Sequence, residues 1–253
     1  MIASIHHKIN IGLHIIEKRS SGYHALETVF YPCKNFEDTI EITSSSSFSF
    51  MLKNANFSCN TEDNLCVKAY RLLQKKHDLS PVQITLTKQI PAGAGLGGGS
   101  ADAALTLKML NNLFSLKLSK KQLHAYAAQL GSDTAFFLYD SPMYATGRGE
   151  ILTPIDLDLS PCKIEIVCPN ITISTTEAYK AITPKKPIVS LKQIIQFPVE
   201  TWKGNIVNDF EEVIFKQHPQ LLEIKNEFYR RGAIYAAMSG SGSAVYGVFF
   251  TQR

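Results

Sequence analysis

Glycine is concentrated in one stretch of the sequence, Pro91 to Ala104, where five of the seven residues from 93 to 99 are glycine. The composition then turns to Ala and Leu, which is typical of a helix. Backbone N–H groups converge where a glycine-rich loop runs into a helix N-terminus, and the helix dipole there favours negative charge. The stretch therefore predicts a phosphate site.

Two familiar nucleotide loops fit this stretch poorly. A Walker A loop requires Gly-Lys-Ser/Thr, whereas Gly99 precedes Ser100 with no lysine between them. A Rossmann dinucleotide loop is formally matched by Gly93-x-Gly95-x-x-Gly98, but it requires an acidic residue about twenty positions further on. No acidic residue occurs between 102 and 133. Both interpretations are therefore disfavoured.

Two further alternatives are a protein-kinase loop and a purely structural turn. The kinase loop would be followed by Val-Ala-Ile-Lys, His-Arg-Asp and Asp-Phe-Gly motifs, and none occurs. A structural turn explains two or three glycines rather than five. We expect a phosphate cradle of another design, in which Ser100 could contact a phosphate-bound Mg²⁺. Ser100 could also be a simple N-cap, and the two roles are compatible.

Strands dominate the N-terminal part of the predicted fold and helices follow, without a βαβ rhythm, which favours the α+β class. The apolar alternation predicts an antiparallel meander, with Pro32 ending its second strand. Thr or Asp residues are candidate caps for the helix after 61–64, Ser119 for a helix to 130, and Thr175 or Thr176 for a helix into 179. The predicted strands cover 2–16, 23–31, 39–43, 48–50, 82–88, 143–146, 150–152, 163–168, 233–237 and 244–250, and the predicted helices include 101–114 and much of 188–231.

Composition indicates an ordinary folded protein of 253 residues, with 45% hydrophobic and 19% charged residues. The net charge of +4 is spread over scattered basic pairs, so we expect no nucleic-acid partner. No apolar stretch is long enough to span a bilayer and no signal peptide is recognisable, so we expect no membrane association and a cytoplasmic location. Five free thiols are expected, at Cys33, Cys59, Cys66, Cys162 and Cys168.

Three stretches together resemble the three motifs of the GHMP small-molecule kinases. They are Lys8–Leu13, Pro91–Ala104 and Met238–Ser243. Four further stretches resemble the branch of that superfamily that phosphorylates a cytidine diphosphate-linked methylerythritol: Ser21–Phe30, Glu62–Leu65, Gly131–Phe137 and Asn208–Glu211. The resemblance covers nearly the whole chain in the right order.

The resemblance implies a two-domain GHMP kinase fold. Residues 1–153 would form the ATP-binding domain, whose fold is like domain 2 of ribosomal protein S5. Residues 154–253 would form a ferredoxin-like domain that contributes to the substrate site. The implied reaction is ATP- and Mg²⁺-dependent phosphorylation of the position-2 hydroxyl of 4-diphosphocytidyl-2-C-methyl-D-erythritol, in non-mevalonate isoprenoid synthesis, by a monomer or weak homodimer. The alternatives are a homoserine- or mevalonate-type kinase, or a non-catalytic nucleotide-binding protein.

The matching motifs also imply roles for individual residues. Lys8 and Asp133 would form the catalytic pair, and Ser100 would contact the metal. The phosphates would be held by Pro91, Ala92, Gly93, Ala94, Gly95, Leu96, Gly97, Gly98, Gly99, Ser100 and Ala101, with Asn64, Leu65 and Lys88 near the adenosine. Tyr23 and Tyr179 would sandwich the cytosine ring, His24 would hydrogen-bond its edge, and Asn10 and Thr175 would approach polar groups of the substrate.

Lys8 and Asp133 can each be assigned a chemical role or a purely structural one. Asp133 could accept the proton of the attacking alcohol, and Lys8 could keep Asp133 ionised and stabilise charge on the transferred phosphoryl group. On sequence alone, Asp133 could equally be a surface turn residue or cap, and Lys8 a solvated strand lysine. Tyr23 and His24 could be ordinary sheet residues.

The sequence departs from the family pattern at two places. His6-His7 precedes Lys8 where the family usually has Pro-Ala, so the path into that strand could differ. Tyr179 stands where an aromatic residue, often Phe, is expected. Tyr179 keeps a stacking face and adds a hydroxyl group.

Overall fold

The computed structural model describes residues 1–20, 22–55 and 60–251. Ser21 of the predicted turn and Cys59 lie outside the described residues. The chain forms two compact units. Unit 1 contains 1–7, 36–92 and 97–140, and unit 2 contains 8–35, 93–96 and 141–253. Strands β1 (Ile2–Lys18) and β2 (His24–Ser44) each contribute residues to both units.

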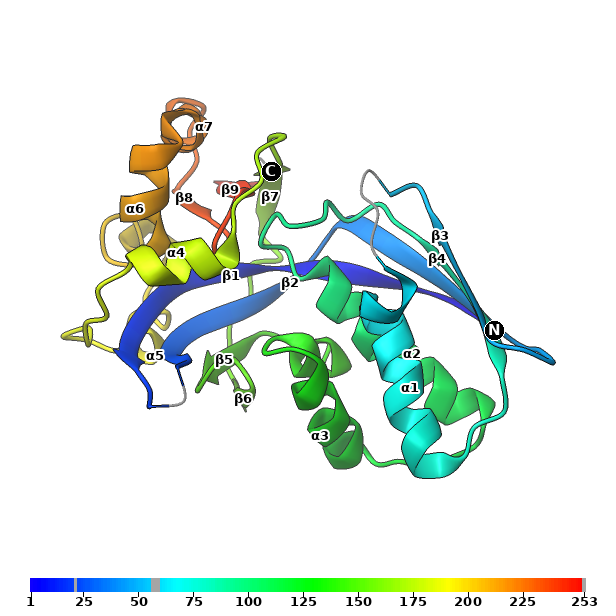
Figure 1. Cartoon of the computed structure of the whole chain (residues 1–253). Helices are drawn as coiled ribbons and strands as arrows, with labels where there is room; N and C mark the ends of the chain where they lie inside the picture. Colours follow the sequence, from blue (N-terminus) through cyan, green and yellow to red (C-terminus); the bar gives the residue numbers. More distant parts are fainter. Residues whose placement is uncertain (21, 56–59, 252–253) are drawn as a thin grey trace. The chain divides into compact units, whose positions relative to one another are not determined.

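In unit 1, the helices pack together on one side of the strands (Figure 1). The end of β2 pairs antiparallel with β4 (Val82–Thr87), with Thr39 opposite Thr87. Strand β3 (Ser49–Lys53) pairs with β4 in the parallel direction, so the predicted antiparallel meander is wrong at β3. The helical elements are η1 (Thr61–Asp63), α1 (Leu65–His77), α2 (Gly98–Leu113), α3 (Lys120–Leu130) and the 3-10 helix η2 (Thr134–Leu138).

Strand β2 passes through Pro32 without a break, whereas the sequence predicted that Pro32 would end a strand. Proline fixes φ near −65°, which extended backbone tolerates, and its missing N–H removes one possible ladder bond. The part of β2 before Pro32 pairs with β5 at Thr28–Phe30, and the part after it pairs with β4 at Thr39–Ser44. Pro32 lies outside these two segments, and β2 also pairs with β1.

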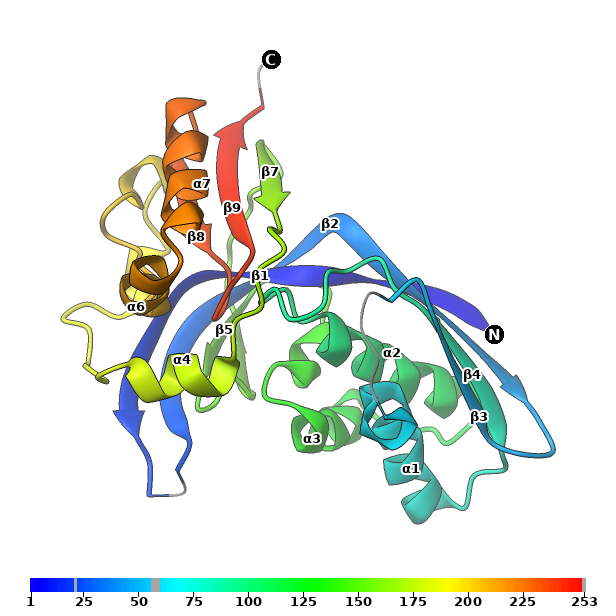
Figure 2. The same cartoon turned by 45° about the horizontal axis from the view of Figure 1, so that its top comes forward.

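Unit 2 contains a three-stranded antiparallel sheet in which β9 lies between β7 and β8 (Figure 2). Helix α7 packs on β8 and β9. The elements of unit 2 are β5 (Met143–Thr146), β6 (Ile151–Pro154), β7 (Cys162–Val167), α4 (Thr175–Ala181), α5 (Leu191–Ile194), η3 (Val199–Thr201), α6 (Phe210–Gln217), α7 (Pro219–Arg230), β8 (Tyr235–Met238) and β9 (Val245–Phe250).

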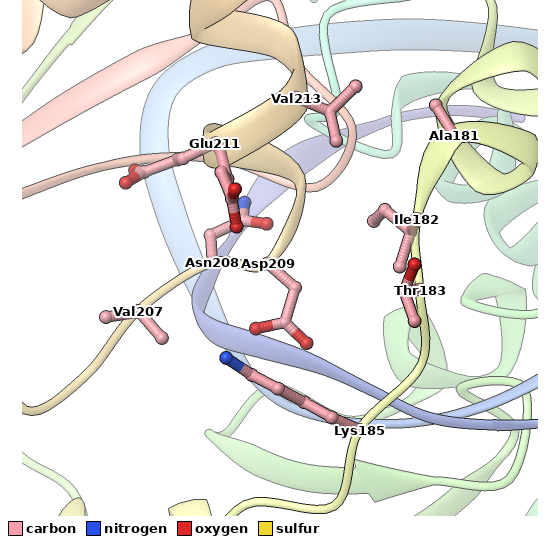
Figure 3. A pocket seen from close by; sticks show the side chains of 10 residues that line it. Ala181, Ile182, Thr183, Lys185, Val207, Asn208, Asp209, Glu211 and Val213 are labelled. Atoms are coloured by element: carbon pink, nitrogen blue, oxygen red, sulfur yellow. The ribbon is translucent and has the colours of Figure 1, made fainter.

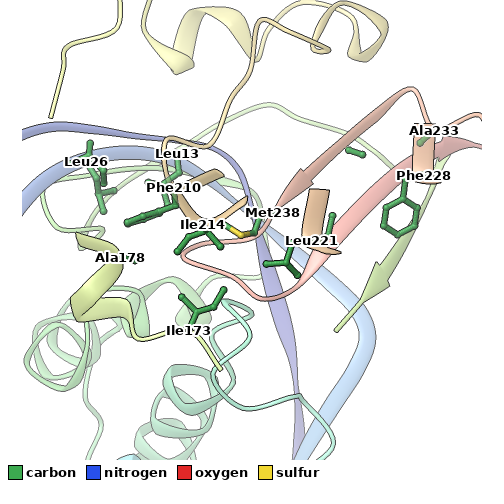
Figure 4. Close-up of a cluster of buried hydrophobic side chains, with 13 residues drawn as sticks. Leu13, Leu26, Ile173, Ala178, Phe210, Ile214, Leu221, Phe228, Ala233 and Met238 are labelled. Atoms are coloured by element: carbon green, nitrogen blue, oxygen red, sulfur yellow. The ribbon is translucent and has the colours of Figure 1, made fainter. Parts of the chain in front are cut away.

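An apolar cluster in unit 2 joins strands β1, β8 and β9 to helices α4, α6 and α7 (Figure 4). Leu13 and Ile15 of β1 meet Phe210 and Ile214 of α6 in this cluster. Burying such side chains contributes about 1.5–3 kcal/mol each. The cluster therefore fixes the strand that carries Lys8 and Asn10.

Helix caps differ from the prediction at three of four positions. Asn64, rather than Thr or Asp, caps α1, because its side chain accepts a hydrogen bond from the Cys66 N–H. Ser174, one residue before the predicted threonines, caps α4. Ser119 caps α3 in a capping box, as predicted. Helix α2 begins at Gly98, three residues earlier than expected, with Gly97 as its N-cap. Ser100 therefore lies inside the first turn and is not the N-cap.

Across residues 1–20, 22–55 and 60–251, no helix is long and apolar enough to cross a membrane. The cysteines within these ranges, Cys33, Cys66, Cys162 and Cys168, are free thiols, as predicted. The units are groups of contacting residues, so the predicted domain boundary between 153 and 154 stays a prediction.

Candidate active site

The glycines of the loop serve two different purposes. A Cβ on Gly95 would lie 2.0 Å from the Ser239 carbonyl oxygen, and one on Gly98 would lie 2.9 Å from Ile90 Cγ2. Both positions therefore require glycine for packing alone. A Cβ on Gly93 would meet nothing within 4 Å, and Gly93 has φ +68°, which L side chains rarely adopt. Only part of the glycine content is therefore available to explain a phosphate cradle.

In unit 1, the first turn of α2 holds the predicted base. The Ser100 hydroxyl donates a 2.6 Å hydrogen bond to Asp133 Oδ1. Gly131 makes room for this pair, because a Cβ there would lie 3.3 Å from Ser100 Oγ. Asp133 precedes the 3-10 helix η2, and its side chain does not cap that helix. The Asp133 carboxylate is thus turned to the start of α2, where N–H groups lack helical partners.

In unit 2, Lys8 is buried, with 3% of its surface exposed, so the interpretation as a solvated strand lysine is wrong. Its Nζ donates to Asn10 Oδ1 at 2.6 Å and to the Gly95 carbonyl at 2.7 Å. The Lys8 N–H also donates to the Leu96 carbonyl at 3.1 Å. Strand β1 therefore holds the glycine loop through both its backbone and its lysine.

Lys88, predicted to lie near the adenosine, is buried in unit 1 between two carboxylates. Its Nζ donates to Asp38 Oδ2 and, at 2.7 Å, to Asp102 Oδ2. Asp38 Oδ1 accepts the N–H groups of Gln89 and Ile90, and Asp102 Oδ1 is buried without a hydrogen-bond partner. Burial, together with the Asp38 carboxylate, outweighs the Lys88 ammonium and raises the pKa of Asp102 to about 8. Burial lowers the pKa of Lys88, whereas Asp102 and Asp38 raise it. The effect of the two acidic side chains is larger, so the pKa of Lys88 is raised.

The Asn208–Glu211 motif holds other parts of unit 2 in place. Asn208 Nδ2 donates to the carbonyls of Met238 and Gly240, both at 2.8 Å. Asp209 Oδ2 accepts the Ile15 N–H at 2.8 Å. Glu211 accepts the Met238 N–H at 2.7 Å. Asn208, Asp209 and Glu211 line a hollow of about 580 Å³, and its opposite wall is formed by Ala181, Ile182, Thr183 and Lys185 (Figure 3). The motif thus anchors β1 and residues Met238–Ser243, which form a second Gly/Ser loop.

Two of the three aromatic side chains predicted to bind cytosine stack on each other. His24 stacks on Tyr179, with ring centroids 5.1 Å apart, and Tyr179 packs edge-on against Phe210. Tyr23 is 56% exposed, and the Arg148 guanidinium lies 4.9 Å from its ring centroid. Burial, with help from Lys18, lowers the pKa of His24, which favours a neutral imidazole.

Thr175 Oγ1 lies 3.1 Å from Ser241 Oγ, so the predicted polar contact of α4 borders the second Gly/Ser loop. The sequence reasoning did not single out four residues that now surround the predicted site residues. They are Thr28, Asp38, Arg148 and Ser239. Ser239 lies in a recognised motif and could have been found. Thr28 also lies in a recognised stretch, Ser21–Phe30, whereas Asp38 lies within a strand and carries no local signal.

Two GHMP kinase family descriptions match the chain. "GHMP kinases N terminal domain" matches residues 64–141, and "GHMP kinases C terminal" matches 199–253. A Bacteroides thetaiotaomicron protein named 4-diphosphocytidyl-2-C-methyl-D-erythritol kinase is 52% identical over 253 residues, which is 98% of this chain and 92% of that protein. The protein of the same name from Cytophaga hutchinsonii is 42% identical, over 100% and 93% of the two chains. This chain belongs to the 4-diphosphocytidyl-2-C-methyl-D-erythritol kinase family.

Solved structures agree with membership of this kinase family. A crystal structure of 4-(cytidine 5'-diphospho)-2C-methyl-D-erythritol kinase is 31% identical, with a TM-score of 0.80 over 98% of this chain and 90% of that one. Streptococcus pneumoniae phosphomevalonate kinase, solved in complex with phosphomevalonate and AMPPNP, is 14% identical with a TM-score of 0.72 over 100% and 93%. The second likeness shows the shared fold alone. The predicted two-domain α+β fold of the GHMP kinases is confirmed.

Proposed function

We propose that this chain transfers the γ-phosphoryl group of ATP to the position-2 hydroxyl of 4-diphosphocytidyl-2-C-methyl-D-erythritol, a step of non-mevalonate isoprenoid synthesis. One observation carries the proposal: kinases of that name match this chain at up to 52% identity over nearly the full length of both proteins. The glycine loop that runs into α2 supports it, because a 16-residue helix places its N-terminal dipole and N–H groups there.

Asp133 acts as the general base in this proposal. An alcohol is a weak nucleophile at neutral pH, and a carboxylate within hydrogen-bond reach can accept its proton as the new P–O bond forms. The Ser100 hydroxyl donates to Asp133 Oδ1, which orients the carboxylate toward the start of α2. Orientation by a second group is common among catalytic bases.

Lys8 stabilises negative charge on the transferring phosphoryl group. In unit 2 its ammonium donates to the Asn10 amide oxygen and to the Gly95 carbonyl of the glycine loop. A buried ammonium that is held in place beside a phosphate site stabilises the negative charge that develops there. Its predicted pairing with Asp133 belongs to this proposal as well.

The residues present fit Mg²⁺ that arrives with ATP. In the described ranges, no group of three His, Cys, Asp or Glu side chains could hold a metal. Mg²⁺ is commonly held by one or two protein oxygens together with substrate phosphates, and Ser100 Oγ and Asp133 provide such oxygens. When bound, Mg²⁺ neutralises phosphate charge.

The acceptor is recognised through its cytosine ring. Tyr23 presents an exposed face, and base stacking on an aromatic ring contributes about 1–3 kcal/mol. In this proposal Tyr179 contacts the other face of the base and His24 its edge, and the two rings stack on each other. We also propose that the protein acts as a monomer or weak homodimer in the cytoplasm. Light scattering of the purified protein measures its oligomeric state.

The decisive experiment offers the purified protein ATP, Mg²⁺ and one acceptor at a time. We expect ADP and a phosphorylated product, identified by mass spectrometry and ³¹P NMR, with the cytidine diphosphate-linked methylerythritol. Turnover of homoserine or mevalonate instead would make the chain another GHMP kinase. ATP binding without turnover of any acceptor would make it a non-catalytic nucleotide-binding protein.

One variant tests the base in the same assay. Asp133→Asn should keep ATP affinity and lose about 10²–10⁴-fold in kcat, the usual contribution of a positioned base. Asp140→Asn, an exposed aspartate seven positions away, is the matched control and should turn over normally. Near-normal turnover by Asp133→Asn would contradict the assignment.

A further inference from the structure

A chain of side-chain hydrogen bonds in unit 2 leads from Lys8 to the backbone of its own strand. Lys8 Nζ donates to Asn10 Oδ1 at 2.6 Å. Asn10 Nδ2 donates to Thr28 Oγ1 at 3.0 Å, and Thr28 Oγ1 donates to the Gly12 carbonyl at 2.5 Å. Thr28 is fully buried and lies on β2 opposite Ala145 of β5. The chain joins β1 to β2 beneath the lysine.

The direction of each bond in this chain follows from the one before it. The Gly12 carbonyl can only accept, so the single hydroxyl proton of Thr28 points to Gly12. Thr28 Oγ1 can then only accept from Asn10, so the Asn10 NH₂ group faces Thr28. The remaining atom, Asn10 Oδ1, faces Lys8. The threonine hydroxyl therefore decides which end of the amide meets the ammonium.

We propose that Thr28 is a positioning residue for Lys8: its hydroxyl orients the Asn10 amide so that an oxygen, and not an NH₂ group, holds the lysine ammonium. This inference rests on the proposed function only in giving Lys8 a part in phosphoryl transfer. Without the hydroxyl, the Asn10 NH₂ group loses its acceptor, and the amide that holds the ammonium is less firmly fixed.

The Gly95 carbonyl, which also accepts from Lys8, is held in place independently of Thr28. The Gly95 carbonyl also accepts from Ser239 Oγ at 2.9 Å. Ser239 Oγ in turn accepts the Asn10 N–H at 3.1 Å, and Asn208 holds the carbonyls on either side of Ser239. Loss of the Thr28 hydroxyl leaves these bonds intact. It therefore displaces the ammonium without removing the loop.

The first test compares Thr28→Val, which keeps the branched shape, with Thr28→Ser, which keeps the hydroxyl. Thr28→Val should lower kcat about 10–100-fold, because small displacements of reacting groups cost that much. The KM values for ATP and the acceptor should stay within about twofold, as expected when only the reacting geometry changes. Thr28→Ser should restore most of the kcat. Equal kcat in the valine and wild-type proteins would overturn the proposal. Thr28→Ala replaces the valine variant if that does not fold.

A double-mutant cycle with Asn10→Asp separates orientation from general loss of structure. Both oxygens of an aspartate accept, so its orientation no longer matters to Lys8, whereas the Gly12 carbonyl loses its donor in both backgrounds. Thr28→Val should therefore cost less than about threefold in kcat once residue 10 is aspartate. An equal cost in both backgrounds would show a merely structural role and overturn the proposal.

A readout without catalysis keeps the inference distinct from the proposed function. Limited acetylation followed by mass spectrometry gives the modification rate of Lys8 relative to Lys88, a buried lysine of unit 1. The ratio should rise several-fold in Thr28→Val and stay at the wild-type value in Thr28→Ser. An unchanged ratio in the valine variant would overturn the inference. If the ratio shifts as expected in Thr28→Val but the Lys8→Met protein turns over normally, the inference stands and Lys8 has no part in the proposed function.

Discussion

Two lysines are buried in this protein in opposite ways, one in each unit. Lys88 in unit 1 is 6% exposed and donates to the carboxylates of Asp38 and Asp102. Lys8 in unit 2 is 3% exposed and donates to the amide of Asn10 and the carbonyl of Gly95. Degree of burial therefore does not distinguish them, whereas these contacts differ: two carboxyl groups in unit 1, and an amide and a carbonyl in unit 2.

The difference shows how a buried charge becomes available for function. The Asp38 carboxylate and the Asp102 carboxyl group both accept from the Lys88 ammonium, so Lys88 ties the end of β4 to α2 and has little field left for a ligand. In unit 2 the Asn10 amide and the Gly95 carbonyl hold the Lys8 ammonium against the glycine loop, where we propose that it acts on a phosphate. We expect Lys88 to govern stability and Lys8 to govern turnover.

Lys88→Met should give the largest change in stability. Removal of the cation leaves Asp38 and Asp102 buried without it, and breaking a buried ion pair in this way costs about 3–5 kcal/mol. Urea denaturation measures the loss. The kcat of the folded fraction should change less than about tenfold, and the KM for ATP in the same assay tests whether Lys88 lies near the adenosine.

Lys68→Met is the matched control for that variant. Lys68 lies 3.3 Å from Asp63, but the two side chains are 46% and 69% exposed. Exposed pairs contribute about 0–1 kcal/mol. If Lys88→Met unfolds no more easily than Lys68→Met, Lys88 is not the structural lysine of the pair.

Lys8→Met should reverse the pattern, with a kcat about 10²–10³-fold lower, the usual effect of removing one preorganised charge-stabilising group. The cost in unfolding free energy should be smaller than for Lys88→Met. Asn10 Oδ1 loses its donor, at about 1–3 kcal/mol, whereas Gly95 keeps the Ser239 hydroxyl. Steady-state kinetics and urea denaturation on one preparation compare both effects. A stability loss that exceeds the loss for Lys88→Met would break the contrast.

The smallest effect concerns pH. The pKa of Asp102 is raised from 3.8 to about 8, so the folded state holds a proton that the unfolded state has released. Its contribution to stability is complete below about pH 4 and is lost as the pH rises toward 8. Asp102→Asn should therefore flatten the decline of unfolding free energy between pH 5.5 and 8.5, by about 1 kcal/mol per pH unit at most. Parallel pH profiles for the variant and wild type would contradict a protonated Asp102.

Local pattern was a good guide to elements and a poor one to pairing. The alternation of 82–88 and the capping box at Ser119 appear in the structure as predicted. The parallel pairing of β3 with β4 and the passage of β2 through Pro32 were missed, because neither leaves a periodic trace in the sequence. Ser100 was considered as a cap, and the early start of α2 placed it inside the first turn.

The sequence by itself determined the glycine loop, the helix after it, the family and the candidate residues Lys8 and Asp133. Those features are local, since they depend on residue types at fixed spacing. Tertiary structure alone decided the partners: Asp133 with Ser100 across 33 positions, Lys8 with Gly95 across 87, and Ser239 with Asn10 across 229. Contacts at such separations depend on packing, which no local spacing encodes. The glycine loop therefore contains glycines of two kinds. Packing against Ser239 requires Gly95, whereas Gly93 faces open space.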